Sequence, residues 1–229
     1  MRLAIIPARG GSKRIFRKNI RPFCGKPILA YSIETALKSK CFDSVIVSTD
    51  DEEIADIAQF YGANVPFKRP RYISDDHTGT AQVIAHAIVH STYDLRLIKA
   101  VCCIYATAPL LQAHYLQEGY DLLMNSSADY SLSITRFATP IQRALSIDED
   151  HQIKMLVPQN ATKRSQDLQD TSHDAGQFYW GKTHAWLEEK PILSPDSRGI
   201  ILPHYLVQDI DTLEDWKHAE YIYKAIHCS

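Results

Sequence analysis

Short apolar runs alternate with amphipathic segments along the first 125 residues. Runs at 3–6, 44–50 and 97–105 are typical of strands buried on both faces of a sheet. The segments between and after them, at 27–40, 51–62, 80–91 and up to about 125, repeat apolar positions at helical spacing. A further short strand is predicted at 63–67, after a helix-ending glycine, Gly62. This alternation predicts βαβ units and a mainly parallel sheet.

The pattern changes after about residue 129. Residues 129–137 and 152–157 are predicted as antiparallel strands, whereas 158–176 are polar and without a period. A strand pattern returns at 199–211, and a helix is expected from Thr212, which stands at capping-box spacing from Asp215. We therefore predict an α/β fold with a single domain over residues 1–229. A protruding arm is expected within it, at about 137–172.

Composition and charge narrow the possible partners. The 229 residues carry a formal net charge of −2, so neither nucleic acid nor an acidic membrane surface is expected as a partner. The five cysteines are odd in number and form no CxxC motif, which disfavours a zinc site or a disulfide framework and favours free thiols. The N-terminal apolar run is too short for a signal peptide or a membrane span. We expect a cytoplasmic protein.

A basic loop follows the first predicted strand directly. Residues 9–18 contain five cationic side chains and two adjacent glycines, Gly10 and Gly11, and no acidic residue precedes Glu34. Ligands of open parallel sheets bind beyond the carboxyl ends of the strands. The glycines are expected to adopt positive φ and to bring backbone N–H groups close to an anion. The loop therefore predicts a polyphosphate site, and a solvated loop without a ligand is the alternative.

The sequence was searched for two known phosphate-binding motifs, the dinucleotide-binding pattern and the Walker A pattern. The strict G-x-G-x-x-G pattern is absent from the first turn, which argues against a nicotinamide or flavin site there. Residues 176–183, "GQFYWGKT", match the Walker A pattern formally. Their bulky residues are typical of a strand and cannot wrap a phosphate, so we reject the match. A P-loop kinase or ATPase that uses residues 176–183 stays an alternative.

Asp209 and Asp211 stand two residues apart in a predicted extended segment. Both carboxylates would then point to one face, with Ile210 turned to the other. Two hard oxygen ligands suit Mg²⁺ that also contacts phosphates. The rival pairs, residues 50–51 and 75–76, are interpreted as helix-start acids and as a turn.

Four motifs together resemble the sugar-activating cytidylyltransferases: "PARGGSKR…RKN", "VIVSTDDEEIA", "RP…SDDHTGT" and the late "DIDT". The resemblance implies a Rossmann-like nucleotidyltransferase fold, mostly parallel, with helices on both faces. It also implies that CTP and a nine-carbon 2-keto sugar acid yield a CMP-sugar and pyrophosphate. "CIYATAPL" and "SQDLQDTSHDAGQFYWG" are most similar to the pseudaminic acid branch. Legionaminic acid, sialic acid or Kdo as acceptor, or a catalytically silent nucleotide-binding module, are the alternatives.

The resemblance also implies roles for individual residues. Lys18, Arg9 and Asp211 are expected to be catalytic, and Mg²⁺ is expected on Asp209 and Asp211. The residues expected to hold the nucleotide are Arg9, Gly10, Gly11, Ser12, Lys18, Asn19, Arg69, Thr78 and Thr80. Those expected to contact the sugar are Tyr105, Thr107, Arg164, Gln166 and Gln177. A homodimer is implied, in which the arm reaches the partner subunit's site. No histidine stands out as a general base.

Overall fold

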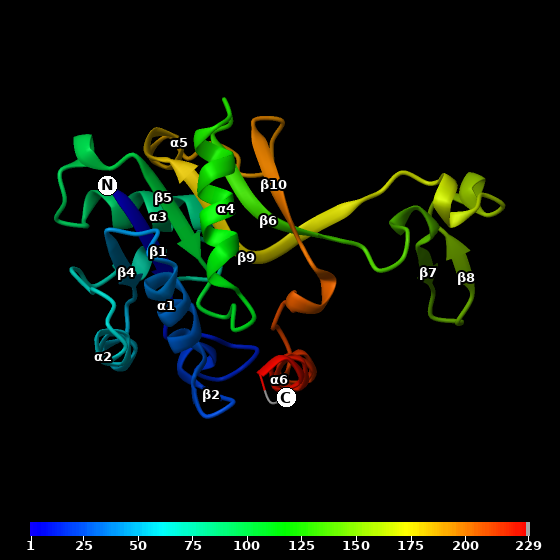
Figure 1. The fold of residues 1–229 in the computed structure, drawn as a ribbon. Coiled ribbons are helices and arrows are strands. Elements are labelled where there is room, and N and C mark those ends of the chain that lie inside the picture. Colours follow the sequence, from blue (N-terminus) through cyan, green and yellow to red (C-terminus); the bar gives the residue numbers. More distant parts are fainter. Residues whose placement is uncertain (228–229) are drawn as a thin grey trace.

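A six-stranded sheet forms the centre of the computed structural model, which describes residues 1–227 (Figure 1). Cys228, one of the predicted free thiols, lies outside the described residues. The strands are β1 (Arg2–Pro7), β4 (Ser44–Ser48), β5 (Ala100–Ile104), β6 (Tyr130–Arg136), β9 (Ser172–Lys182) and β10 (Ser197–Leu202). Their order is β10-β6-β9-β5-β1-β4. All neighbours are parallel except β9, which is antiparallel to both β5 and β6. The predicted α/β class with a mostly parallel sheet is confirmed.

Helices cover both faces of this sheet. They are α1 (Ile28–Ser39), α2 (Glu52–Phe60) and α4 (Ala113–Met124) on one face, and α3 (Thr80–Val89) and α5 (Thr183–Leu187) on the other. The two cores divide β1 between them, because successive strand residues point to opposite faces. Ala4 and Ile6 pack in the first core, whereas Leu3 and Ile5 pack in the second. The uninterrupted apolar run is thus a strand buried on both sides, as predicted.

A third, smaller core ties the C-terminal helix α6 (Leu213–His227) to the region just after the basic loop. Trp216 of α6 packs with Phe23 of the short β2–β3 hairpin, which consists of β2 (Pro22–Phe23) and β3 (Lys26–Pro27). Ile15 of the loop and Ile210 are buried in the same cluster. This core therefore brings the Asp209–Asp211 segment beside the basic loop, about 190 residues away in sequence.

The predicted helix ends are confirmed by their hydrogen bonds. At α2, the Asp51 carboxylate accepts from the Ile54 N–H at 3.0 Å, and Gly62 follows the helix with φ of 92°. At α6, the Thr212 N–H donates to the Asp215 carboxylate at 2.7 Å, and the Asp215 N–H donates back to the Thr212 hydroxyl at 3.2 Å. These bonds satisfy N–H groups that a helix leaves without partners.

The short strand predicted at 63–67 is wrong. A single bridge joins Asn64 to Ile46 there, and the chain then leaves the sheet edge. Pro66 has no N–H to continue the ladder, which gives a physical reason for the early end. Residues 176–182, in contrast, lie in β9 within the sheet, and Thr183 begins α5. Phe178, Tyr179 and Trp180 are buried in β9. No phosphate-wrapping loop exists at the formal Walker A match, so its rejection is confirmed.

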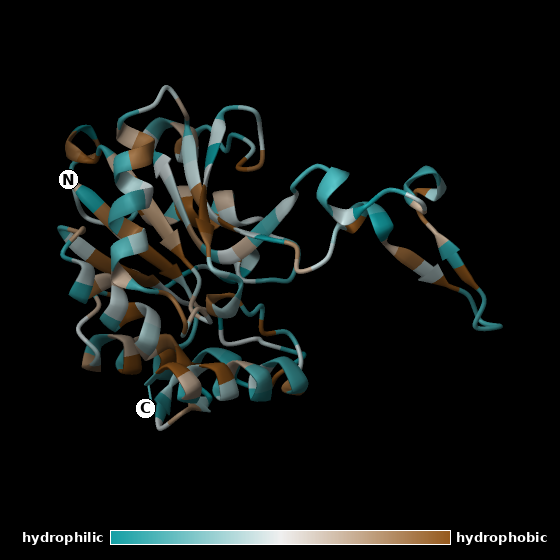
Figure 2. Ribbon diagram, turned by 45° about the vertical axis from the view of Figure 1, so that its right-hand side comes forward, coloured by the Kyte–Doolittle hydropathy of each residue, from teal (hydrophilic) through white to brown (hydrophobic). Residues whose placement is uncertain are grey.

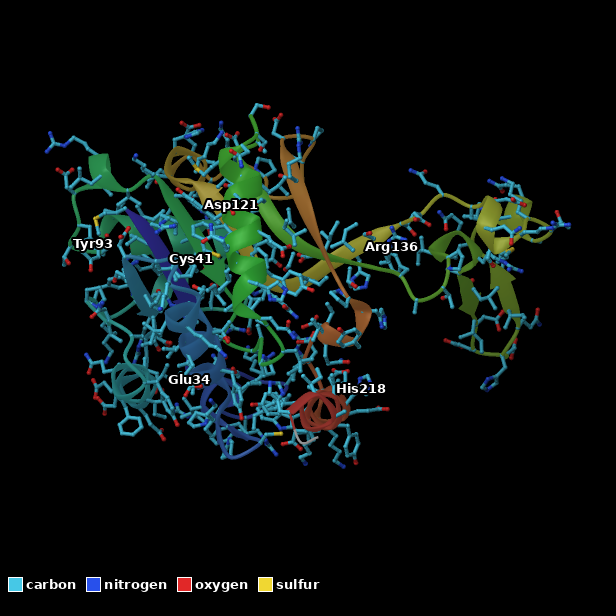
Figure 3. The ribbon with its side chains drawn as sticks, in the orientation of Figure 1. Glu34, Cys41, Tyr93, Asp121, Arg136 and His218 are labelled. Carbon is cyan, nitrogen blue, oxygen red and sulfur yellow. The ribbon has the colours of Figure 1, made fainter. Side chains whose placement is uncertain are left out.

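Between β6 and β9 the chain extends away from the sheet, as Figure 1 shows. This arm carries a hairpin of β7 (Leu145–Ile147) and β8 (Ile153–Met155), and short 3₁₀ turns. Arg136 at its base (Figure 3) forms an ion pair with Asp170 at 3.1 Å. The arm exposes Leu145, Ile147, Ile153 and Leu156, and brown segments of its ribbon in Figure 2 mark hydrophobic residues. None of the helices in residues 1–227 combines the length and the apolar character of a membrane span.

Candidate active site

A pocket lies beyond the carboxyl ends of β1 and β5, and we call it the basic pocket. Pro7 closes β1 at its wall, and Tyr105 follows β5 directly. Of the residues predicted for the site, the pocket brings together Arg9, Ser12, Lys18, Asn19, Arg69, Thr78, Thr80, Tyr105 and Thr107. They come from the basic loop, the 69–80 connection and the chain after β5. Their convergence agrees with the predicted position of a ligand site in an open parallel sheet.

The predicted conformation of the two glycines is wrong. Neither Gly10 nor Gly11 has a positive φ, whereas Arg17 in the same loop does, at 53°. Gly10 is required for a different reason, since a Cβ there would lie 2.6 Å from Asp51 Oδ2. The Gly10 N–H already donates to the Asp50 carboxylate at 3.0 Å. The loop backbone is therefore held against the start of α2. Of the two loop glycines, Gly11 is the one with open space where a Cβ would lie.

The positive charges of the loop have acidic partners, contrary to the inference from sequence. Arg9 and Lys13 each lie 2.5 Å from the Asp76 carboxylate, which lowers the pKa of Asp76. Arg14 lies 2.6 Å from Asp211. Both acids are far away in sequence, which is why a search near the loop could not find them. A polyanion entering this pocket could displace the carboxylates from their cations.

Lys18 lies between the basic loop and the Asp209–Asp211 segment. Its Nζ donates to the Ile210 carbonyl at 2.6 Å and lies 3.5 Å from Asp211 Oδ1. Its side chain is only 19% exposed, so the ammonium is held in place and not free in solvent. Next to it, the Asn19 amide donates to the Arg9 carbonyl at 2.9 Å. Asn19 thus braces the loop that carries the cations.

Arg69 is a buried cation at the floor of the basic pocket. The residue is 4% exposed, and its Nε has no hydrogen-bond partner among the described residues. Burial lowers the pKa of its guanidinium, while the charge of Asp50 opposes that shift. A buried N–H group without an acceptor is costly. Because Arg69 also lines the basic pocket, its charge is placed to meet an anionic ligand there.

Arg17 differs from the other loop cations because it faces away from the basic pocket. Its guanidinium contacts both oxygens of Asp51, at 2.5 and 3.0 Å, and Glu53 at 2.5 Å. The hydrogen bond to Asp51 raises the pKa of Arg17 and lowers that of Asp51. Arg17 therefore fastens the loop to α2.

A second pocket adjoins the first, and Tyr105 lines both. The other walls of the second pocket come from β9, from the chain after β10 and from α6. Helix α6 contributes His218 (Figure 3). Asp209 lines this second pocket, whereas Asp211 pairs with cations of the basic pocket. Ile210 between them is 1% exposed, as the extended pattern predicted. The two aspartates consequently stand where the pockets meet.

The two aspartates fit a divalent cation in part. Partial burial of its carboxyl and the neighbouring Asp211 charge raise the pKa of Asp209, while the charge of Lys18 opposes that shift. No cluster of three or more His, Cys, Asp or Glu within residues 1–227 could hold a metal ion. Mg²⁺ needs no such cluster when phosphates and water complete its shell. Of the rival acids, Asp51 caps α2 and Asp75 accepts from the Thr78 N–H and hydroxyl, as predicted. Asp50 and Asp76 instead contact the basic loop.

Three residues predicted for the sugar line neither pocket. Arg164 and Gln166 are exposed on the arm, in and beside the turn Ser165–Asp167. Gln177 is buried in β9, where its Nε2 donates to the Leu206 carbonyl at 2.5 Å. A sugar contact by Arg164 or Gln166 would need a second copy of the chain.

Asp174 and Tyr179 line the second pocket together and were missed. The Tyr179 hydroxyl donates to Asp174 Oδ2 at 2.7 Å. Residues five apart on a regular strand point to opposite faces. Here β9 bulges, because Leu132 and Ile134 of β6 pair with Tyr179 and Asp174, and Gly176 in the bulge has φ of 63°. The glycine of the Asp-Ala-Gly sequence within the strand is the feature from which the bulge could have been predicted.

Comparisons with known proteins agree with this geometry. The family model described as "Cytidylyltransferase" matches residues 3–220. A pseudaminic acid cytidylyltransferase of Campylobacter jejuni subsp. jejuni is 46% identical over 98% of this chain and 97% of its own length. A Helicobacter pylori protein named as both a pseudaminic acid cytidylyltransferase and a hydrolase of a UDP-linked diacetamido-trideoxy sugar is 37% identical, over 91% of this chain and 40% of its own length.

The fold comparison extends to a more distant enzyme. A structure of CMP:2-keto-3-deoxy-manno-octonic acid synthetase with CTP superposes with a TM-score of 0.72 at 14% identity, covering 98% of this chain and 99% of that one. At that identity the likeness supports the fold alone. With the family match over nearly the whole length, the sheet and the basic pocket lead to one conclusion: the chain belongs to the cytidylyltransferase family.

Proposed function

We propose that this cytidylyltransferase transfers CMP from CTP to the anomeric hydroxyl of pseudaminic acid. The observation that carries the nucleotide half is the convergence of Arg9, Lys18 and the buried Arg69 on one pocket. The 46% identity to a named pseudaminic acid enzyme over nearly the full chain supports the choice of acceptor. In the reaction the anomeric oxygen bonds to the α-phosphorus and loses its proton, and the bond between this phosphorus and the α–β bridging oxygen breaks.

The residues of the basic pocket would stabilise the negative charge of the reacting phosphates. Lys18 and Arg9 would contact the triphosphate, and their charge counts most where electrons shift onto the leaving pyrophosphate. Arg69 would donate to the nucleoside or a phosphate oxygen deeper in the pocket. Asp209 and Asp211 would hold Mg²⁺, which when bound would neutralise part of the phosphate charge.

The acceptor would lie in the second pocket, next to Tyr105. No lysine or arginine is among the described residues that line this pocket. A sugar carboxylate therefore lacks a cationic partner within the chain, and Arg164 on the arm of another copy is the candidate. The exposed apolar side chains of the arm would be covered in the same homodimer, since such side chains favour contact with a partner.

The cytoplasm stays the expected compartment, in keeping with the free thiols of Cys41, Cys102 and Cys103.

A pyrophosphate-release assay with CTP and a panel of acceptors tests the proposal. Pseudaminic acid should give the highest kcat/KM among pseudaminic, legionaminic and sialic acids and Kdo. A higher value for another acid would reassign the acceptor and leave the chemistry intact. CTP binding without turnover on any acceptor would favour the silent module, and stabilisation by ATP in place of CTP would contradict the proposed nucleotide.

The metal assignment has its own test. Asp211→Ala should abolish turnover while the protein stays folded, since the change removes an oxygen ligand and no core volume. Asp209→Ala should be milder, because water can replace a ligand at a more open position. Wild-type activity of Asp211→Ala across a Mg²⁺ titration would exclude this site.

A further inference from the structure

His218 and Gln208 line the second pocket together, next to Asp209. His218 lies on α6, and Gln208 belongs to the chain after β10, directly before Asp209. Nδ1 of the His218 ring lies 2.6 Å from the side-chain oxygen of Gln208, Oε1. This contact joins the two elements at the wall of the pocket.

The surroundings of the Gln208 amide determine which of its ends faces His218. Its NH₂ group donates to the Asp209 carbonyl at 2.8 Å and to Asp215 Oδ1 at 3.4 Å. Hydrogen bonds from Thr212 lower the pKa of Asp215, so this carboxylate is ionised at neutral pH and only accepts. Turning the amide over would place Oε1 against two acceptors. Oε1 therefore has to face His218.

The orientation of the amide fixes the tautomer of His218. An amide oxygen only accepts hydrogen bonds, so Nδ1 carries the proton and donates it to Gln208. A neutral imidazole has one such proton, and Nε2 is then left with a lone pair. The bond to Gln208 is the one hydrogen bond that this ring makes within residues 1–227. Nε2 is consequently left for a ligand of the second pocket.

We propose that His218 binds the sugar acid through Nε2 as a hydrogen-bond acceptor, and that Gln208 is the positioning residue that keeps Nε2 in this role. Nε2 then selects a hydroxyl or N–H group of the sugar acid. It does not bind the sugar carboxylate, which has no proton to donate. The inference rests on the proposed function, since it takes the sugar acid to occupy the second pocket.

The tautomer can be measured without any substrate. In a nitrogen–hydrogen NMR correlation spectrum, a ring nitrogen with a proton and one with a lone pair give separate signals. At about pH 8, where histidine side chains are mostly neutral, His218 should carry its proton on Nδ1. His227 serves as an internal reference, because its Nδ1 lies 2.9 Å from the Tyr223 carbonyl and must donate to it.

Gln208→Ala should shift the proton of His218 toward Nε2 and leave the His227 signals unchanged. The signals of His218 are identified by their loss in His218→Asn. A wild-type protein in which His218 carries its proton on Nε2 would overturn the inference.

Two substitutions of His218 separate Nε2 from the rest of the ring. His218→Asn keeps an NH₂ group near the position of Nδ1, so it can still donate to Gln208, but it removes Nε2. His218→Gln is long enough to present its amide oxygen near the position of Nε2. His218→Asn should raise KM for the sugar acid about three- to tenfold, whereas His218→Gln should stay within about twofold of the wild type. The Kd for CTP should not change in either variant.

His227→Asn is the matched control for the kinetics. His227 lies on the same helix, has the same tautomer and lines neither pocket, so KM for the sugar acid should not change. Melting temperatures check that all variants are folded. A wild-type KM for the sugar acid in His218→Asn, or a loss confined to kcat, would overturn the inference while the proposed function stands. A wild-type protein that turns over none of the acceptors would overturn both.

Discussion

The two pockets use different physical means to hold their ligands. The basic pocket is lined by five cations of the loop and the 69–80 connection, namely Arg9, Lys13, Arg14, Lys18 and Arg69, and by acids that pair with several of them. The second pocket has no lysine or arginine among its described lining residues and offers hydroxyl, imidazole and carboxylate groups. The first can exchange its own ion pairs for those with a polyanion. The second offers hydrogen-bonding groups to a ligand and no lysine or arginine among its described lining residues.

This difference has a consequence for variants. A charge that stabilises shifting electrons should affect turnover, whereas a group that only orients a ligand should affect binding. Variants of the basic pocket should therefore change kcat or CTP affinity. Variants of the second pocket should act mainly on the acceptor.

The largest effect is expected for Lys18→Ala. Its ammonium is held at the junction of the pockets by the Ile210 carbonyl and Asp211, so it is positioned before the ligand arrives. We expect kcat to fall by a factor on the order of 10² or more, with a much smaller rise in KM for CTP. Steady-state kinetics at fixed Mg²⁺ measure both. A loss confined to KM would mean that Lys18 attracts the anion and does nothing further.

Arg69→Ala and His218→Ala should separate the two ligands. Without Arg69 the nucleotide loses a charged hydrogen-bond donor, and the Kd for CTP should rise about 10- to 100-fold. His218 hydrogen-bonds Gln208 at 2.6 Å in the second pocket, so its loss should raise KM for the sugar a few-fold and leave CTP binding unchanged. Calorimetry with CTP alone and kinetics with varied sugar test the pair. Weaker CTP binding in His218→Ala would show that the pockets are not separate.

Arg17→Ala should change stability more than catalysis. The residue faces Asp51 and Glu53 and not the basic pocket, so kcat/KM should fall about tenfold at most. Loss of a two-oxygen contact that is largely shielded from solvent should lower the free energy of unfolding by about 1–3 kcal/mol. Denaturant unfolding alongside the kinetics distinguishes the two effects. A loss of kcat as large as that of Lys18→Ala would refute this division of the loop.

The smallest effect concerns Asp209 in the protein without metal. Its carboxyl has a raised pKa, so the ionised form destabilises the folded state at neutral pH, and stability is regained as the pH falls through this pKa. Asp209→Asn should therefore melt slightly higher at pH 7, by about 1 °C. The difference should vanish below the ordinary pKa of 3.8, where Asp209 itself is protonated. Melting curves in EDTA at several pH values measure it, and a lower melting point at pH 7 would contradict the assignment.

Sequence reasoning succeeded where local pattern decides the structure. The strand at residues 3–6 and the buried Ile210 between two aspartates follow from side-chain periodicity alone. Sequence reasoning failed where contacts between distant segments determine which residues meet. The partners of the basic loop come from Asp76 and Asp211, whose approach depends on how the 69–80 connection and α6 pack. The Asp174–Tyr179 contact depends on a bulge, which shifts the side-chain alternation on which strand predictions rest.

The reversed strand β9 also bears on how the chain folds during synthesis. β9 lies between β5 and β6 in the finished sheet, yet it follows both in sequence and comes after the whole arm. Until residue 182 has left the ribosome, β5 has an open edge of unpaired backbone groups. At about 5–20 residues per second, that edge waits on the order of several seconds. Nascent chains halted before β9 should consequently be the form most prone to aggregation, and the polar sequence that precedes β9 would help to keep them in solution during this interval.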